Sequence, residues 1–225
     1  MQSRSIAIIG GTGKEGSGLA LRWAHAGHRV LIGSRLAERA RETAATINDR
    51  IGAQRAEGSD NLAAAQGGDI AVLTVPYAAQ LATLDGIKTA LTGKILIDVT
   101  VPLIPPQVSR VQLPEGGSAG LNAQRLLGDG VRVVSAFQNV SAEHLGVLGH
   151  AIDCDVLVCG DDKDARAEVI ALARDAGMRA FHGGPLANSA AAEALTSALI
   201  AINRQYKIKH SGIRITGLPV DAADG

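Results

Sequence analysis

The chain has 225 residues, with 22 basic and 22 acidic side chains and therefore no formal net charge. This balance gives no electrostatic reason to expect nucleic acid or an anionic membrane as a partner. Hydrophobic residues make up 46% of the chain and charged residues 20%, which excludes a disordered protein and predicts a sizeable core. No apolar run is long enough for a transmembrane helix, and a strand that begins by Ser5 leaves no room for a signal peptide, so we expect a cytoplasmic protein.

A glycine-rich turn near the N-terminus carries the first functional signal. An apolar strand at residues 5–9 runs into this turn, and a helix and a second apolar strand follow, up to Arg35. The turn contains G-x-G-x-x-G as Gly11, Gly13 and Gly16. The first glycine permits the tight turn, the second lets the backbone approach a pyrophosphate, and the third lets helix and strand pack closely. A tight turn without a ligand is the alternative, and the strand–turn–helix context favours a dinucleotide site.

The end of the second strand indicates which dinucleotide is bound. NAD sites usually place Asp or Glu there, about 20 residues past the first glycine, to bind the ribose hydroxyls. This chain has Ser34 and Arg35, with Arg39 one helical turn further on. A carboxylate would repel a 2′-phosphate, whereas a hydroxyl and a guanidinium would bind it. We therefore predict NADP rather than NAD; the alternative is that both arginines are solvated charges at the start of a helix.

The next hundred residues continue the alternation of strands and helices that is typical of a doubly wound sheet. We predict helices at 36–51, 61–65 and 118–127, and strands at 54–57, 69–75, 94–99 and 131–137. With the first two strands this gives six parallel strands, an α/β Rossmann fold. Ligands in such sheets bind beyond the carboxyl ends of the strands, so Val75 and Pro76, at the end of the fourth strand, are expected beside the dinucleotide.

The remainder predicts a small C-terminal α/β extension of this doubly wound parallel sheet. We expect strands at 155–159 and 178–182, helices at 164–176 and 188–206, and a tail at 207–218 that folds back as a strand. Cys154 and Cys159 are expected on opposite faces of one strand, too far apart to pair. Asp161 and Asp162 are expected to cap a helix rather than to bind a metal. We therefore divide the chain into an NADP-binding domain, 1–140, and a smaller layer, 141–225.

The catalytic chemistry is inferred by elimination. The six histidines are scattered without a metal-ligand spacing, and no nucleophile elbow is present, so we expect no metal site and no covalent catalysis. Small hydroxyacid and imine reductases need a catalytic Lys or Asp on the helix after the Rossmann domain, and 188–203 contains no Lys. An acceptor that is itself a redox cofactor, and needs no acid from the protein, fits better.

Seven stretches together resemble the NADPH-dependent coenzyme F420 reductases, also called deazaflavin:NADP oxidoreductases. They are IAIIGGTGKEGSGLALRWAHAGHRVLIGSR, DIAVLTVPY, VPLIPP, VVSAF, VLVCGDD, GPLANS and GIRITGL. The first is widely shared among Rossmann proteins, whereas VCGDD followed by GPLxNS is more specific. The resemblance runs nearly end to end, and it implies a homodimer in which a hydride passes directly between the deazaflavin C5 and the nicotinamide C4.

The resemblance also implies which residues bind the two cofactors. By position, it assigns the pyrophosphate to Thr12, Gly13, Lys14 and Glu15, the 2′-phosphate to Ser34, Arg35 and Arg39, the nicotinamide side to Val75, Ile104 and Ala142, and the deazaflavin to Gln138, Asn139 and Val140. Archaeal members have His, Thr and Ile where this chain has the last three residues. Gln138 can still donate to a ring carbonyl, but it cannot titrate, so we do not expect it to relay a proton.

Two other readings stay open at this point. The departure at 138–140 leaves room for a different acceptor, such as a flavin, a pterin or a ferric chelate. A non-catalytic NADP-binding sensor, whose Ala-rich helix docks a partner, is the second reading. The direction of hydride transfer is not indicated by these residues, because one path serves both directions.

Overall fold

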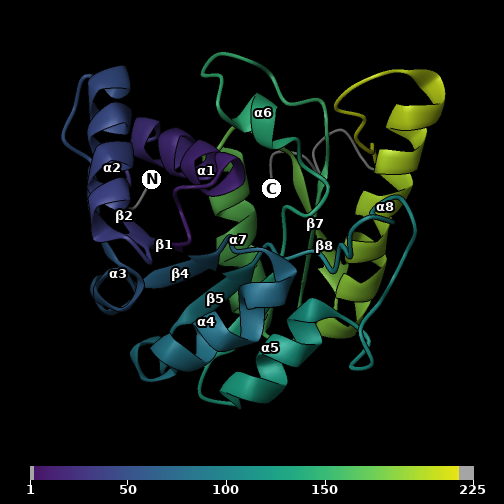
Figure 1. Cartoon of the computed structure of the whole chain (residues 1–225), viewed down its shortest axis with the longest axis horizontal. Helices are drawn as coiled ribbons and strands as arrows, with labels where there is room; N and C mark the ends of the chain where they lie inside the picture. Colours follow the sequence, from purple (N-terminus) through teal and green to yellow (C-terminus); the bar gives the residue numbers. More distant parts are fainter. Residues whose placement is uncertain (1–2, 218–225) are drawn as a thin grey trace.

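The computed structural model describes residues 3–217 and is built on a single eight-stranded sheet (Figure 1). The strands are β1 Ser5–Ile9, β2 Arg29–Ser34, β3 Ala56–Asp60, β4 Ile70–Leu73, β5 Ile95–Asp98, β6 Arg132–Ser135, β7 Val156–Gly160 and β8 Ala180–Gly184. Their order is β3-β2-β1-β4-β5-β6-β7-β8. All neighbours are parallel except β6 and β7, which are antiparallel. The predicted doubly wound sheet with its C-terminal extension is confirmed, and the strand order reverses between β1 and β4.

Helices cover both faces of the sheet, as its strands require. They are α1 Lys14–His25, α2 Ala37–Ile51, α3 Asn61–Gly67, α4 Gln80–Ile87, α5 Ala119–Leu127, α6 Ala142–Leu145, α7 Lys163–Asp175 and α8 Ser189–Tyr206, with 3₁₀ turns η1 Tyr77–Ala79, η2 Lys88–Leu91 and η3 Leu186–Asn188. In β1, Ile6 and Ile8 face the layer of α1, α2 and α7, while Ala7 and Ile9 face α3, α4 and α5. Both sets are fully buried, as expected for a parallel strand covered on both sides.

The third strand begins later than predicted. We expected it at 54–57, and it spans Ala56–Asp60. Oδ1 of Asn48, at the end of α2, accepts from the N–H groups of Arg55 and Ala56 at 2.9 and 2.8 Å and so ties the helix to the start of this strand.

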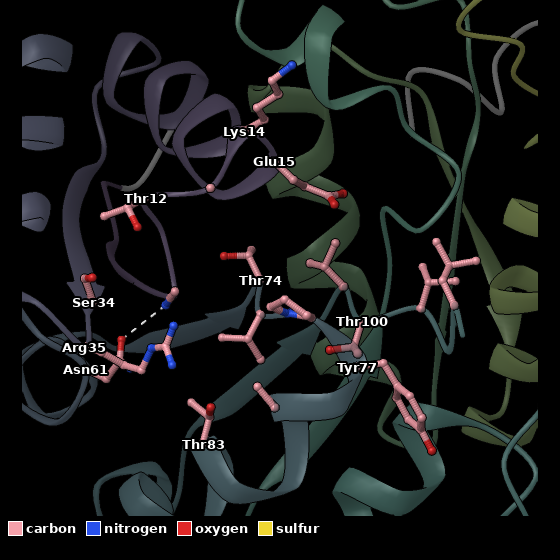
Figure 2. Close-up of a pocket in the computed structure, with 18 of the residues that line it drawn as sticks. Thr12, Lys14, Glu15, Ser34, Arg35, Asn61, Thr74, Tyr77, Thr83 and Thr100 are labelled. Carbon is pink, nitrogen blue, oxygen red and sulfur yellow. Dashed lines mark hydrogen bonds between the residues drawn. The ribbon is translucent and has the colours of Figure 1, made fainter. Parts of the chain in front are cut away.

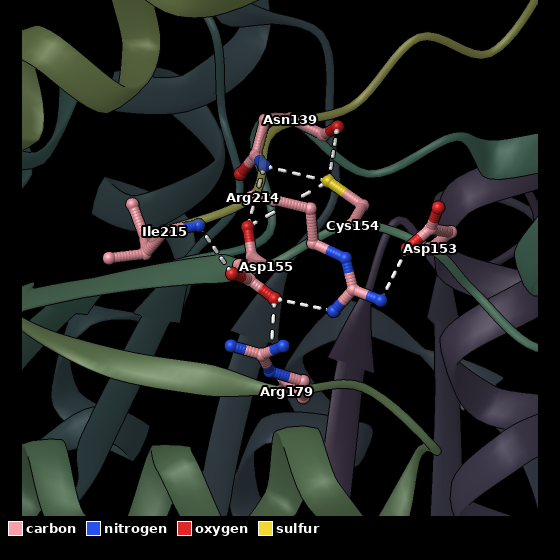
Figure 3. Close-up of polar contacts among 7 residues, drawn as sticks. All are labelled: Asn139, Asp153, Cys154, Asp155, Arg179, Arg214 and Ile215. Atoms are coloured by element: carbon pink, nitrogen blue, oxygen red, sulfur yellow. Dashed lines mark hydrogen bonds and ion pairs between the residues drawn. The ribbon is translucent and has the colours of Figure 1, made fainter. Parts of the chain in front are cut away.

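The described part of the C-terminal tail, up to residue 217, contains no strand, so the predicted tail strand is wrong. The Asp155 N–H does donate to the Ile213 carbonyl at 2.8 Å, as in a ladder. The next hydrogen bond of such a ladder is made by a side chain and not by a carbonyl, because Oδ2 of Asp155 accepts from the Ile215 N–H at 2.7 Å (Figure 3). Cys154 precedes β7 and Cys159 lies in it; both are buried and free.

The two acids before α7 have different partners. Asp162 is the N-cap, accepting from the Ala165 N–H at 2.7 Å, as predicted. Asp161 instead accepts from the Leu186 N–H at 2.9 Å and so ties β7 to η3.

Within residues 3–217 no helix is long and apolar enough to cross a membrane.

Arg22 holds the loop after α6 against α1. Its side chain is 7% exposed, and burial lowers the pKa of its guanidinium. The guanidinium donates to five backbone carbonyls at 2.9–3.0 Å, those of His144, Leu145, Val147, His150 and Ala176. A buried cation without a carboxylate is thus solvated by peptide groups.

Replacing this guanidinium should destabilise the whole fold. We expect Arg22→Met to lower the free energy of unfolding by about 3 kcal/mol, because several buried carbonyls lose their donor at once. Urea unfolding followed by circular dichroism measures this. Arg55→Met, at an exposed position, is the matched control and should change it by less than about 0.5 kcal/mol. Equal stability of both variants would contradict the assigned role.

Candidate functional site

The carboxyl ends of β1, β2, β4, β5 and the turn after β6 open into one cleft of about 620 Å³ (Figure 2). This volume is in the range of small-molecule sites, and the cleft lies where the strand order reverses. Eleven residues that the sequence assigns to the cofactors line it: Thr12, Gly13, Lys14, Glu15, Ser34, Arg35, Arg39, Val75, Pro76, Gln138 and Val140.

The glycines of the turn are required for different reasons. A Cβ on Gly11 would lie 2.8 Å from the Ile8 carbonyl, and one on Gly16 would lie 2.5 Å from Oγ1 of Thr74, so the protein itself forbids side chains there. A Cβ on Gly13 would meet nothing nearer than the Gly10 carbonyl at 3.9 Å. Gly13 faces the cleft. The protein's packing does not need a glycine at this position, so the open space is available to a ligand.

Helix α1 presents its N-terminus to the cleft. Its N-cap is Gly13, which has no side chain to accept from the first N–H groups. These donors and the positive end of the helix dipole suit an anion such as a pyrophosphate. Oδ1 of Asn61 accepts from the Gly10 N–H at 3.2 Å and holds the turn from the other side (Figure 2).

Two charged side chains flank this N-terminus. The Lys14 ammonium lies 3.5 Å from the Glu143 carboxylate, and both side chains are largely exposed. Glu15 extends from α1 into the cleft (Figure 2). Burial raises the pKa of the Glu15 carboxyl to about 8.

A cationic end of the cleft lies beyond β2. Ser34 is buried, and its Oγ accepts from the Leu36 N–H at 3.2 Å. Arg35 and Arg39 are exposed and line the cleft. Across residues 3–217, no carboxylate forms an ion pair with either guanidinium. Both can therefore bind a phosphate without losing a protein partner.

Asp98, at the end of β5, organises a buried polar cluster under the opposite end. Burial raises the pKa of its carboxyl, while donors from Thr100 and Gln80 oppose the shift. Its Oδ1 accepts from the Thr100 N–H at 2.9 Å and its Oδ2 from Nε2 of Gln80 at 2.5 Å. Thr100 lines the cleft, and its hydroxyl, near this carboxyl, has no hydrogen-bond partner of good geometry among the described residues.

The Gln138 amide presents its oxygen to the cleft. Its Nε2 donates to the Asp98 carbonyl and to Oγ of Ser135, both at 2.8 Å, so both of its N–H bonds are used. Its Oε1 has no partner within residues 3–217. The amide therefore offers the cleft an acceptor, and neither N–H is left to donate to a ring carbonyl. Phe137, just before it, has φ 74°, a left-handed backbone conformation that is rare for an aromatic residue.

Helix α8 contributes residues that the sequence analysis missed. Oγ1 of Thr196 donates to the Gln138 carbonyl at 2.8 Å, and Thr196 lines the cleft. The Glu193 carboxylate accepts from the N–H groups of Ala119 and Gly120 at 2.7 and 3.1 Å and so caps α5. Burial raises the pKa of Glu193 to about 7, against the effect of these donors. A single acid in an Ala-rich helix was the available signal.

Three predicted residues do not line the cleft. Ile104 lies in the loop after β5 and is 47% exposed, and Ala142 begins α6. Asn139 is buried, and its Nδ2 donates to Sγ of Cys154 and to the Asp155 carbonyl, away from the cleft (Figure 3). Their assignment to the cofactors stays a prediction.

The Asp155 carboxylate is fully buried and holds the tail close to this asparagine (Figure 3). Its Oδ1 lies 3.1 Å from Nη1 of Arg214 and 3.3 Å from Nε of Arg179. Nearby, the rings of His144, His150 and His210 stack with centroids 4.2 and 4.3 Å apart. Within residues 3–217 no group of His, Cys, Asp or Glu is arranged to hold a metal ion.

The fold and the cleft define the class of protein. A glycine-rich turn at the switch point of a doubly wound sheet, with an arginine pair at the end of the second strand, is the site of a Rossmann-fold oxidoreductase. The model of the family described as "NADP oxidoreductase coenzyme F420-dependent" matches residues 5–102. The chain is 42% identical over 221 residues to the F420-dependent NADP reductase of Methanothermobacter thermautotrophicus, covering 95% of each chain. It is 42% identical over 223 residues to the enzyme of the same name from Methanocaldococcus jannaschii, covering 96% of this chain and 99% of the relative. The chain belongs to the family of F420-dependent NADP reductases.

Solved structures agree with this assignment. The crystal structure of a putative F420-dependent NADP reductase from Arthrobacter sp. FB24 superposes with a TM-score of 0.78 at 25% identity, covering 95% of this chain and all of that one. An imine reductase from Bacillus cereus gives a TM-score of 0.64 at 18% identity, covering 90% of this chain and 62% of the other. The second likeness concerns the fold alone.

Proposed function

We propose that this protein is an oxidoreductase that transfers a hydride directly between NADPH and the deazaflavin coenzyme F420. The observation that carries the proposal is that one continuous cleft joins an anion-binding turn and a cationic end to a floor with buried, unpartnered polar atoms. Relatives named F420-dependent NADP reductase, similar along nearly the whole chain, support it.

The residues present fit NADP(H). The space over Gly13 and the uncapped start of α1 would take the pyrophosphate, with Thr12, Lys14 and Glu15 beside it. Arg35 and Arg39 would hold the 2′-phosphate, and Ser34 would support it. NADP(H) fits because there is space over Gly13 for the pyrophosphate, and because the first N–H groups of α1 and the two guanidinium groups are available as hydrogen-bond donors.

The other end of the cleft would take the rings. Val75, Pro76 and Val140 provide apolar lining, and the Thr100 and Gln138 side chains provide polar atoms. When both coenzymes are bound, NADPH supplies the hydride and F420 accepts it, or the reverse. The chain's task is to align the rings and exclude water, because the coenzymes themselves give and accept the hydride. Ile104, Asn139 and Ala142 remain predicted contacts whose side chains would approach only with ligand or partner present.

We also propose a homodimer. A patch of exposed apolar side chains, the α8 patch, joins the end of α8 to the loop after β5: Ile104, Val111, Ile202, Tyr206 and Ile208, each at least 40% exposed. The two segments lie together, since Nη1 of Arg204 donates to Oγ of Ser109 at 2.9 Å. Exposed apolar side chains gathered on neighbouring segments are typical of a subunit interface.

Two further predictions complete the proposal. A cytoplasmic location fits two free thiols, which suit a reducing compartment. Residues 1–140 would form the NADP-binding domain, and 141–225 the layer that completes the deazaflavin site. Contacts from α8 to the cleft floor support the second part of this division.

Stopped-flow mixing of protein, NADPH and oxidised F420 tests the reaction itself. We expect rapid loss of the deazaflavin absorbance with NADPH and little loss with NADH, because the cationic end of the cleft recognises the 2′-phosphate. If NADPH binds without bleaching F420, and the protein instead reduces free flavin, a pterin or a ferric chelate, then that compound is the acceptor in place of F420. Binding without turnover of any acceptor would favour a sensor.

Arg35→Ala should weaken NADPH binding by about 2 kcal/mol, roughly 30-fold, through loss of a charged hydrogen-bond pair, and leave NADH binding unchanged. Fluorescence titration measures both dissociation constants. Arg55→Ala, at an exposed position away from the cleft, is the matched control. An unchanged NADPH affinity would contradict the 2′-phosphate assignment.

Ile202→Asp should convert the proposed dimer to a monomer, because a carboxylate would be buried without a partner in the α8 patch. Sedimentation velocity at micromolar concentration reports the state. Leu62→Asp, 41% exposed on α3, is a matched control and should stay dimeric. A wild-type chain that sediments as a monomer would refute the dimer.

A further inference from the structure

Two polar atoms in the floor of the cleft are buried and lack a partner. The Thr100 side chain, 3% exposed, and the Gln138 side chain, 5% exposed, both line the cleft. Oε1 of Gln138 makes no hydrogen bond to any described residue, and Oγ1 of Thr100, which lies near the Asp98 carboxyl, makes none of good geometry. A buried polar group that loses its water without gaining a partner is destabilising, so such atoms are expected to meet a ligand.

The Gln138 amide can face the cleft only with its oxygen. Its Nε2 lies 2.8 Å from the Asp98 carbonyl oxygen, which can only accept, so a reversed amide would place two oxygens in contact. Ser135 Oγ, at 2.8 Å, takes the second N–H. The orientation is therefore set by the protein before any ligand arrives.

The backbone around this glutamine is held as well. Phe137 has φ 74°, and its ring is fully buried against Trp23, with centroids 5.9 Å apart. Oγ1 of Thr196 donates to the Gln138 carbonyl. Strained backbone that the surroundings over-determine is typical of ligand-binding positions.

The two atoms come from adjacent strands. Asp98 and Ser135 are register partners in β5 and β6, and Thr100 and Gln138 follow them at the same edge of the sheet. Figure 2 shows Thr100 at the end of the cleft away from Thr12 and Ser34, thus away from the phosphate-binding end. The pair presents one hydrogen-bond acceptor and one hydroxyl, which can donate.

We infer that Thr100 and Gln138 form a recognition site for an amide edge, an N–H beside a carbonyl, on a bound ring. Oε1 of Gln138 accepts from the N–H, and the Thr100 hydroxyl donates to the carbonyl. The inference rests on the proposed function, under which two groups of this chemistry can enter: the nicotinamide carboxamide and the imide edge of the deazaflavin. An isolated charge, a phosphate or a purely apolar ring would leave the Gln138 oxygen unpartnered.

Equilibrium binding to the wild-type protein separates the two sources without any mutation. The first probe is 3-acetylpyridine adenine dinucleotide phosphate, in which a methyl ketone replaces the carboxamide and its N–H. The second is F420 methylated at its imide nitrogen. We expect one probe to bind about 10- to 100-fold more weakly than its parent, because it leaves a buried acceptor unpaired. The weakened probe identifies the amide that is recognised.

Variants test that these two residues are responsible. In Gln138→Leu the parent and its N–H-lacking analogue should bind within about twofold of each other. In Thr100→Val, which keeps the side-chain shape, both should bind about tenfold more weakly than to the wild-type protein, because both retain the carbonyl. Gln66→Leu and Thr46→Val, both at exposed positions, are the matched controls. Calorimetric unfolding temperatures show whether Gln138→Leu is folded. If it is not folded, Thr100→Val and the analogue titrations on the wild-type protein still test the inference.

Wild-type protein that binds each analogue within twofold of its parent overturns the inference, and would indicate that water satisfies both atoms. Failure of NADPH or F420 itself to bind is a separate result, because it refutes the proposed function. If NADPH and F420 both bind, and each analogue binds as tightly as its parent compound, the proposed function stands and only the amide-recognition site is refuted.

Discussion

The close approach of the glycine-rich turn to the end of β4 is the constraint on which the cleft depends. A Cβ on Gly10 would lie 2.5 Å from Cγ1 of Val75, and one on Gly16 would lie 2.5 Å from Oγ1 of Thr74. The Thr74 hydroxyl donates to the Ile9 carbonyl at 3.0 Å, so the two neighbouring strand ends are tied together. Helix α1 can then begin directly over the sheet edge, with its free N–H groups aimed at the space between the strands. Any side chain at these positions would lift the helix and widen the site.

The C-terminal half of the chain builds the floor of the same site. Glu193 on α8 caps α5, and Thr196, one turn further on, holds the carbonyl of Gln138. Strand β7 joins β6 antiparallel, and the Asp155 carboxylate beside it ties the tail to this edge. These contacts join residues as far as 74 positions apart in the chain. The phosphate end also depends on distant residues, because Asn61 accepts from the Gly10 N–H and Thr74 donates to the Ile9 carbonyl.

The range of these contacts along the chain explains what the sequence could and could not predict. The strand–turn–helix at the N-terminus and the arginines after β2 act through local spacing, so the pattern located the phosphate end of the cleft. The resemblance added further residues, and together they named eleven of the 23 residues that line it. In the tail, the Asp155 side chain replaced a strand pairing, because its carboxylate accepts from the Ile215 N–H. The orientation of the Gln138 amide depends on a carbonyl 40 residues earlier, and no local pattern carries that information.

The left-handed backbone at Phe137 has a consequence for redesign of the site. Its ring packs against Trp23 on α1, so a single residue links the helix that starts at the phosphate end to the strand end that forms the floor. Directed evolution towards a bulkier or differently shaped acceptor would gain little by changing this residue, since both its backbone angle and its packing are committed. Thr100, by contrast, lines the acceptor end of the cleft and is not among the residues with a left-handed backbone. Libraries built around the neighbours of Phe137, with Phe137 itself retained, would sample new specificities at the lowest cost in folded protein.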